Sequence, residues 1–159
     1  GFSMDQATVY GYVDSPIGAI EIGASAECVI DVNFVDRRRE TSSQESPVLC
    51  QAIEQIEAYF KRRLQVFDLP LDMAGTPFQR SVWQALLTVP FGHTASYQQM
   101  ADAVGNPKAV RAVGAANGKN PISIIVPCHR IIGKNGSLTG YGGGMWRKEW
   151  LLRHEGVLL

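Results

Sequence analysis

The chain has 159 residues, of which 45% are hydrophobic and 19% charged, and its formal net charge is zero. This length is enough for one solid core or two small domains, and the composition is ordinary for a globular protein. No apolar run approaches the roughly 20 residues of a membrane-spanning helix and no charged-then-apolar leader opens the sequence, so we expect neither a membrane protein nor a secreted one.

Charge is divided unevenly along the chain. Residues 1–74 hold six Lys or Arg against twelve Asp or Glu, whereas residues 75–159 hold nine against three. A basic half of this kind is suited to contact with a phosphate backbone. An attraction that packs the two halves together is equally compatible with the pattern.

The three cysteines, Cys28, Cys50 and Cys128, are an odd number without short spacings. This disfavours a disulfide framework and predicts a reducing, cytoplasmic compartment, or the nucleus in a eukaryote. The sequence has no Cys-x-x-Cys pair, and its three histidines are scattered. We therefore expect no metal site.

The first half of the chain has the pattern of a small sheet followed by a helix. Short runs of strand-forming residues predict an antiparallel meander over residues 8–14, 19–24 and 28–34. A polar loop follows over residues 36–45 and contains three consecutive arginines from Arg37 to Arg39. We expect these arginines to be solvated, with DNA contact as the alternative.

Three helices carry cap signals in their first turns. A Ser-Pro start predicts a helix over residues 47–64, because serine can cap it and proline suits the first helical position. Thr-Pro-Phe-Gln at residues 76–79 combines such a start with a capping box, and predicts the next helix. A second box at residues 96–99 predicts a short helix over 97–104.

Another helix is predicted over residues 107–117, with Asn106 as its cap and a left-handed stop at Asn117-Gly118. Together with residues 97–104 it would form a helix-turn-helix. Most of its residues are small, so it offers few side chains to read a major groove but can approach a minor groove closely. An ordinary helix pair packed through alanines is the alternative.

The residues around Cys128 carry the chemistry. An aliphatic run enters Pro127-Cys128-His129-Arg130, and a second aliphatic pair follows. A thiol becomes a nucleophile when a base takes its proton, and His129 can do so if the backbone turns or a water relays the proton. Glu155 is the candidate to orient the histidine. A buried structural cysteine beside a surface histidine is the alternative.

A last helix is predicted over residues 146–154. We expect Trp150, Leu151 and Leu152 to face inward, and Arg147 and Lys148 to face outward. The glycine-rich stretch before this helix must be a loop whose backbone can lie close to a ligand.

Pro127-Cys128-His129-Arg130 resembles the active-site signature of the O6-alkylguanine-DNA alkyltransferases. The similarity continues, in the order and spacing of that family, over most of residues 75–156 and is weak before them. The matching segments are Tyr97-Gln98-Gln99, Gly105-Asn106-Pro107, Arg111-Ala112-Val113-Gly114, Asn117, Asn120-Pro121 and Lys148-Glu149-Trp150-Leu151-Leu152.

The resemblance implies roles for residues outside the signature. Arg111 would intercalate where the damaged nucleotide leaves the duplex, with Ala112 on the helix face that enters the minor groove. Tyr97 would contact the flipped nucleotide and supply a proton or positive charge as guanine leaves. Lys108 and Lys119 are candidates for phosphate contact, and Asn120 would act as a hinge toward the active-site strand.

The same resemblance implies a guanine pocket. Tyr141 would pack against the base, and the Gly142–Gly143 backbone would form the wall near O6. The carbonyls of Cys128 and Ile131 would accept from the exocyclic amine. Many family members carry serine where Gly142 stands, so a pocket that admits bulkier adducts is a further hypothesis.

We thus predict an α+β fold: an N-terminal antiparallel sheet with a helix (residues 4–74, an RNase H-like arrangement being one option) that supports a helical domain with a helix-turn-helix (residues 75–159). The predicted function is irreversible transfer of an alkyl group from O6-alkylguanine in double-stranded DNA, with O4-alkylthymine as a second candidate substrate, to Cys128. No cofactor is needed and a monomer is expected. The alternatives are a non-catalytic lesion-binding protein and, below it, a helix-turn-helix regulator.

Overall fold

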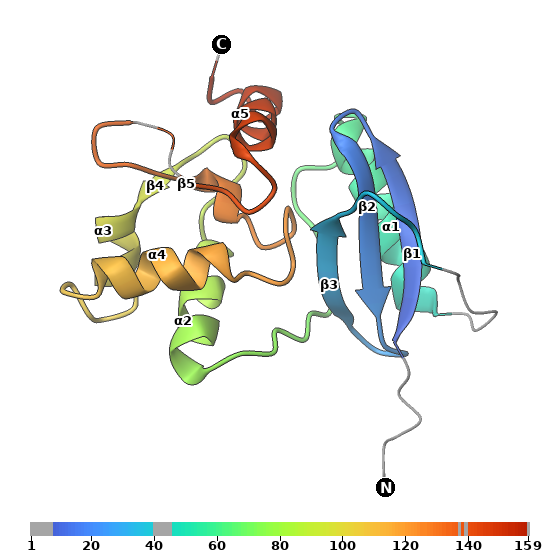
Figure 1. Cartoon of the computed structure of the whole chain (residues 1–159), viewed down its shortest axis with the longest axis horizontal. Coiled ribbons are helices and arrows are strands. Elements are labelled where there is room, and N and C mark those ends of the chain that lie inside the picture. The colour runs from blue at the N-terminus through green and yellow to red at the C-terminus, as the bar shows by residue number, and fades with distance from the viewer. Residues whose placement is uncertain (1–7, 40–45, 137, 139, 159) are drawn as a thin grey trace, which may run out of the picture. The chain divides into compact units, whose positions relative to one another are not determined.

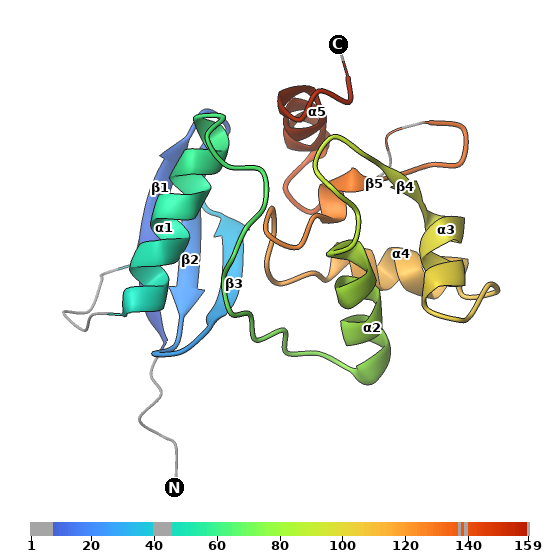
Figure 2. The same cartoon turned by 180° about the vertical axis from the view of Figure 1, so that it is seen from behind.

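The structure, a computed structural model of the chain, describes residues 8–39, 46–136, 138 and 140–158. It forms two compact units, residues 1–73 and residues 74–159 (Figures 1 and 2). This division differs by one residue from the boundary chosen on sequence. None of the helices in the described ranges is long and apolar enough to cross a membrane.

The N-terminal unit is built on a three-stranded sheet. Its strands are β1 (Val9–Ser15), β2 (Gly18–Ala24) and β3 (Val29–Phe34). They pair antiparallel in the order β1-β2-β3. The predicted meander is confirmed, and each strand begins within one residue of its predicted start.

Helix α1 (Pro47–Phe60) lies along one face of this sheet (Figures 1 and 2). The Ser46 hydroxyl accepts a hydrogen bond from the Leu49 amide at 3.2 Å, so the predicted cap is present. Contact with the sheet is close at Gly11, where an added Cβ would lie 2.7 Å from Ile53 Cδ1.

The prediction that α1 continues to residue 64 is wrong, because the backbone turns back after Phe60. Arg62 is left-handed, with φ of 62°. The Arg63 amide donates to Ala58 O at 2.8 Å and the Arg62 amide to Tyr59 O at 3.2 Å. This is the Schellman arrangement that usually contains glycine, here formed by arginine, so composition did not reveal it.

The arginines that follow β3 contact their own unit. Arg38 forms an ion pair with Asp14, and Arg39 Nε lies 3.2 Å from Glu21 Oε2. Their side chains are still 51% and 59% exposed, as expected of a solvated loop. Residues 40–45 of the predicted loop lie outside the described residues.

The C-terminal unit is mainly helical. Its elements are α2 (Pro77–Leu86), β4 (Ala95–Ser96), α3 (Tyr97–Ala103), α4 (Val110–Gly118), η1 (Cys128–Arg130), β5 (Ile131–Ile132) and α5 (Met145–His154). Strands β4 and β5 pair in parallel. Trp83 of α2 is buried and donates its indole N–H to Ala116 O of α4 at 2.8 Å, which fixes these two helices together.

Both predicted capping boxes are present. At α2 the Thr76 hydroxyl accepts from the Gln79 amide at 3.1 Å, while Gln79 Oε1 accepts from the Thr76 amide at 2.9 Å. Ser96 and Gln99 form the same pair of bonds at α3. Helices α3 and α4, joined by a turn, are the predicted helix-turn-helix.

Removal of the Thr76 cap should destabilise the chain modestly. The Thr76→Ala variant loses one hydrogen bond to an otherwise unpaired amide, so the free energy of unfolding should fall by about 1 kcal/mol. Urea unfolding monitored by circular dichroism measures this. Ser81→Ala, in the interior of the same helix, is the matched control and should change stability by less than about 0.5 kcal/mol. Equal losses in the two variants would contradict the capping role.

The predicted start of α4 and its left-handed stop are wrong, although the helix ends within one residue of its predicted end. The helix begins at Val110 rather than residue 107, and its N-cap, Ala109, forms no side-chain cap bond. Residues 106–109 instead form a turn, which Gln98 holds by donating to Pro107 O at 2.9 Å. At the other end the helix continues through Gly118, and the cap residue Lys119 has φ of −102°, so no left-handed stop occurs.

Helix α5 begins at Met145, one residue before its predicted start. Leu151 and Leu152 are buried and Trp150 is half-buried, as expected. The prediction that Lys148 faces outward is wrong, because its side chain is fully buried. A single lysine in a helix rich in charged residues gives no sign in the sequence that it points inward.

Candidate active site

Cys128 is delivered by a turn rather than by a strand. The active-site strand that the resemblance implies does not run into Cys128: the Val126 amide donates to Ile122 O at 3.0 Å, and the Cys128 amide donates to Val126 O at 2.8 Å. Ile124 is left-handed, with φ of 72°, which is unfavourable for a β-branched residue. Its buried side chain and the surrounding turn hold it there, so the backbone that aims Cys128 is fixed by packing.

Two buried asparagines fix this turn. Asn120 Nδ2 donates to Val126 O at 2.8 Å, and its Oδ1 accepts from the Ile122 amide at 2.9 Å. Asn117, in the last turn of α4, donates to Cys128 O at 3.4 Å. Asn120 therefore connects the end of α4 with the cysteine segment, which is the geometry expected of a hinge. The contact of Asn117 with Cys128 was not predicted, because in the sequence Asn117 was interpreted only as part of the helix end.

The backbone turn at η1 places His129 beside a carboxylate. His129 Nε2 lies 2.7 Å from Glu155 Oε2, and both side chains are fully buried. Burial lowers the pKa of His129, while the hydrogen bond and charge of Glu155 oppose that shift. The other ring nitrogen, Nδ1, has no hydrogen-bond partner among the residues that the structure describes. The histidine is thus oriented through one nitrogen, with the second uncommitted.

Glu155 is also held by a cation, Arg130. Arg130 Nε donates to Glu155 Oε1 at 2.7 Å and Nη2 donates to Oε2 at 3.0 Å, while Nη1 donates to Val89 O at 2.7 Å. Burial alone would raise the pKa of Glu155, but the bonds and charges of His129 and Arg130 outweigh it and lower the pKa to about 2. Glu155 is therefore a carboxylate at any physiological pH. Arg130 received no role from sequence, because its partners are 25 and 41 residues away.

Lys148 is another buried cation of this site. Its Nζ donates to the carbonyl oxygen of Ile131, the residue after η1. Burial lowers the pKa of Lys148 to about 8, and the charge of Cys128 opposes that shift. Burial likewise raises the pKa of the Cys128 thiol, against a hydrogen bond from Asn120 and the charge of Lys148.

Of the residues predicted to form the guanine pocket, Ile131 and Tyr141 are the ones with a described link to the Cys128 segment. Ile131 is buried, and burial together with the charge of Cys128 raises the pKa of Tyr141 well above its ordinary value. Arg147 donates to Gly143 O at 2.9 Å. Gly142 is exposed, and a Cβ added there would meet no atom within 4 Å. A serine side chain would therefore fit at position 142. Because glycine stands there instead, the space that a serine would fill is open.

The predicted DNA-contacting residues lie on α4 and its flanks. Arg111, Ala112, Lys108 and Lys119 are all exposed. Tyr97, the first residue of α3, is half-buried, and its ring lies against Gly114 of α4, where an added Cβ would be 3.8 Å from Tyr97 Cε1.

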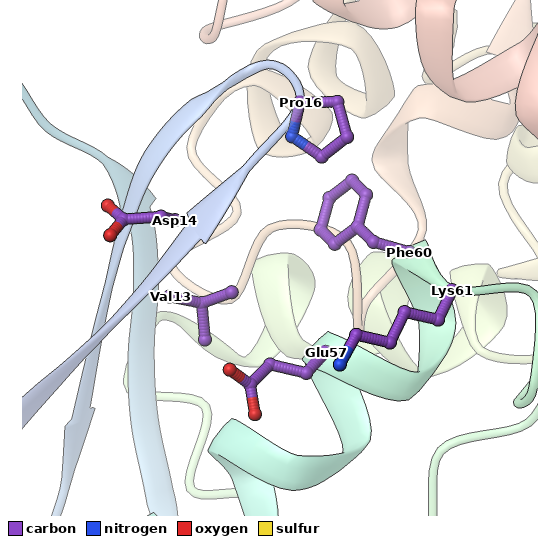
Figure 3. A pocket seen from close by; sticks show the side chains of 6 residues that line it. All are labelled: Val13, Asp14, Pro16, Glu57, Phe60 and Lys61. Carbon is purple, nitrogen blue, oxygen red and sulfur yellow. The ribbon is translucent and has the colours of Figure 1, made fainter.

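No other described feature competes as a catalytic centre. A cavity of about 240 Å³ in the N-terminal unit is lined by Val13, Asp14, Pro16, Glu57, Phe60 and Lys61 (Figure 3). It combines an apolar floor with acidic and basic groups but contains no nucleophile. Within the part of the chain that the structure describes, no three His, Cys, Asp or Glu side chains gather as metal ligands would.

Comparison with known proteins matches both units to one family. Residues 8–73 match the ribonuclease-like domain, and residues 77–157 the DNA-binding domain, of 6-O-methylguanine DNA methyltransferase. The chain is 49% identical over 150 residues to a methylated-DNA–protein-cysteine methyltransferase of Mycolicibacterium paratuberculosis, which covers 92% of this chain and 91% of that protein. A protein of the same name from Methanosarcina acetivorans is 47% identical and covers 92% and 97%.

Solved structures agree. The crystal structure of Mycobacterium tuberculosis O6-methylguanine methyltransferase superposes with a TM-score of 0.85 at 45% identity, covering 94% of this chain and 93% of that one. The structure of Mycobacterium tuberculosis OGT in complex with DNA gives 0.84 at 45% identity and covers 94% of each chain. The resemblance seen in the sequence is confirmed: the chain belongs to the 6-O-methylguanine DNA methyltransferase family.

Proposed function

We propose that this chain repairs DNA directly, by moving the alkyl group of O6-alkylguanine in double-stranded DNA onto Cys128, once per molecule. The observation that carries the proposal is the buried arrangement of Cys128, His129 and Glu155. The histidine beside the thiol is bound to a carboxylate through Nε2 at 2.7 Å and keeps Nδ1 uncommitted among the described residues. Family membership and the names of the relatives support the same reaction.

The proton moves first. His129 Nδ1 takes it from the Cys128 sulfur, directly or through a water, because its other nitrogen is bonded to Glu155. Glu155, with its pKa lowered to about 2, stays ionised and stabilises the imidazolium that forms. Removal of that carboxylate would leave a buried histidine that gains a charge without compensation.

Transfer is then one displacement. The thiolate attacks the alkyl carbon, a carbon–sulfur bond forms, and the bond from that carbon to guanine O6 breaks with its electron pair remaining on the guanine. Tyr97, or a donor near it, supplies the proton that neutralises the leaving base. The product is a thioether, and no step returns the thiol, so enzyme and acceptor are the same molecule. The reaction needs no cofactor.

The base must reach the thiol by leaving the duplex, at a cost of a few kcal/mol in lost stacking and pairing. Arg111, exposed on α4, fills the space that the nucleotide vacates, and exposed Ala112 lets the helix approach the minor groove. Lys108 and Lys119 contact phosphates, so affinity for DNA falls with salt. Tyr141, Gly142, Gly143 and the Ile131 carbonyl form the guanine pocket, with O4-alkylthymine as a second substrate.

The N-terminal unit has a supporting role, and we propose that the chain acts as a monomer in the cytoplasm. Asn120 keeps the end of α4 in register with the cysteine segment through its bonds to Val126 and Ile122. Binding of α4 to DNA thereby places the pocket opposite the extruded base.

Intact-protein mass spectrometry tests the proposal. The wild-type chain, mixed with excess duplex that carries O6-methylguanine, should gain one methylene in mass and stop at one per chain. Cys128→Ala should gain nothing, and Cys50→Ala, which removes an exposed cysteine on α1, should react like wild type. Tight binding of the lesion without a mass change would instead favour a non-catalytic lesion-binding protein.

A further inference from the structure

Asn117 is a buried polar side chain that the mechanism above does not use. It lies in the last turn of α4 and is 5% exposed. The other residues on the buried face of this helix, Val113 and Ala116, are apolar. A leucine at position 117 would complete that face, whereas an amide there must replace the hydrogen bonds that it loses from water. The amide of Asn117 therefore needs partners.

Only one of the two polar atoms of this amide has a partner among the described residues. Nδ2 donates to Cys128 O at 3.4 Å, and this contact sets the orientation of the amide, because a carbonyl oxygen can only accept. Oδ1 is buried and accepts no hydrogen bond from the part of the chain that the structure describes. A buried acceptor without a donor destabilises the folded chain, so its presence points to a donor that is not part of the protein.

The two carbonyls expected to receive the guanine amine already accept hydrogen bonds within the protein. Cys128 O accepts from the Ile131 amide and from Asn117 Nδ2, which uses both of its lone pairs. Ile131 O accepts from Lys148 Nζ, so at most one of its lone pairs is left for a ligand. An exocyclic amine has two hydrogens to donate. A second acceptor beside the cysteine is therefore required.

The unpaired oxygen of Asn117 lies where such an acceptor is required. It shares a carbon atom with Nδ2, which contacts Cys128 O, so it is within reach of a group bound beside that carbonyl. We propose that Asn117 is a specificity-determining residue, whose Oδ1 accepts a hydrogen bond from the exocyclic amine of the extruded O6-alkylguanine. The inference deepens the proposed function and rests on it, since the base enters the pocket only in the repair reaction.

The test compares two bases that differ only in the amine. One duplex carries O6-methylguanine, and the other carries 6-methoxypurine, which is the same base without the exocyclic amino group. Intact mass follows single-turnover transfer from each duplex to wild type and to Asn117→Leu, which keeps a similar volume and removes both polar atoms. Asn33→Leu, the same change at an exposed asparagine of β3, is the matched control.

The ratio of the two transfer rates isolates the hydrogen bond to the amine. Wild type should prefer O6-methylguanine about 10-fold or more, which corresponds to one net hydrogen bond. In Asn117→Leu this preference should fall about 10-fold, whatever slowing both substrates share through the lost bond to Cys128 O. Asn33→Leu should keep the wild-type preference.

An unchanged preference in Asn117→Leu would overturn the inference even if both rates fell, because a purely structural side chain affects both substrates equally. If Asn117→Leu does not fold, the Cys128→Ala chain, which has no sulfur to accept the alkyl group, decides. With ¹³C in its asparagine side chains, the Cγ resonance of Asn117 should move downfield on binding the O6-methylguanine duplex and much less on binding the 6-methoxypurine duplex. Equal shifts would refute the hydrogen bond.

Failure of this inference can be distinguished from failure of the proposed function. Transfer with an unchanged preference would contradict only the role of Asn117. Absence of transfer from O6-methylguanine to wild type would contradict the proposed function, and the resonance of Asn117 would still test the hydrogen bond, because it requires binding alone. A chain that does not bind the lesion at all would contradict both.

Discussion

The Glu155→Gln variant should transfer a methyl group at least roughly 100-fold more slowly than wild type, within the range that one general-base system contributes. Glutamine has nearly the same shape, but its neutral amide cannot stabilise the imidazolium that forms 2.7 Å away. Single-turnover transfer from an O6-methylguanine duplex, followed by intact mass, measures the rate. Glu149→Gln, on the exposed side of α5, is the matched control and should react normally.

The same substitution should also destabilise the chain. Arg130 is buried and donates two hydrogen bonds to Glu155, so loss of the carboxylate leaves a buried guanidinium charge without a partner. This should lower the free energy of unfolding by about 3–5 kcal/mol. The double variant Arg130→Met, Glu155→Gln removes both charges and should regain much of this stability in urea unfolding. It should still transfer slowly. If transfer recovers together with stability, Glu155 is only structural and the proposed relay is wrong.

The Trp83→Ala variant should lose about 3–5 kcal/mol of unfolding free energy, as large core truncations do. Trp83 is 1% exposed, and its indole holds α2 to α4 through the bond to Ala116 O. Part of the loss should appear as weaker binding to undamaged DNA, because α4 loses its support.

Chemical denaturation and a salt-matched binding titration measure the two effects. Trp146→Ala is the control, since that side chain is 57% exposed and contacts Arg147 through a cation–π interaction that adds little at an exposed site. A loss in Trp83→Ala no larger than in Trp146→Ala would show that α2 and α4 are held together by other contacts.

Local signals explain which parts of the fold could be predicted. The meander and the capping boxes at Thr76 and Ser96 depend on residues within a few positions of each other, and the sequence displays them fully. The end of α1 depends on the left-handed backbone of Arg62, and the start of α4 depends on the hydrogen bond from Gln98 to Pro107 O. Neither feature could be predicted from the residue types in the sequence.

In the candidate site, too, the local features could be predicted from the sequence and the long-range contacts could not. Cys128 and His129 stand out as neighbours in an aliphatic segment, and the need for a group to orient the histidine led to Glu155; their roles stay predictions. The sequence could not show that Arg130 shares the carboxylate, or that Lys148 turns inward to the Ile131 carbonyl. Both contacts join segments 17 or more residues apart, and both involve cations, which are usually solvated.

Helix α5 carries Lys148 and is followed at once by Glu155, so a single docking event brings both groups to η1. While α5 is undocked, His129 has no carboxylate to orient it, and Lys148 does not reach the Ile131 carbonyl. Under the proposed relay, the Cys128 thiol of such a molecule lacks an oriented base and should react slowly with electrophiles until the helix docks. Hydrogen exchange of the α5 amides would report the fraction of molecules in which the helix is docked.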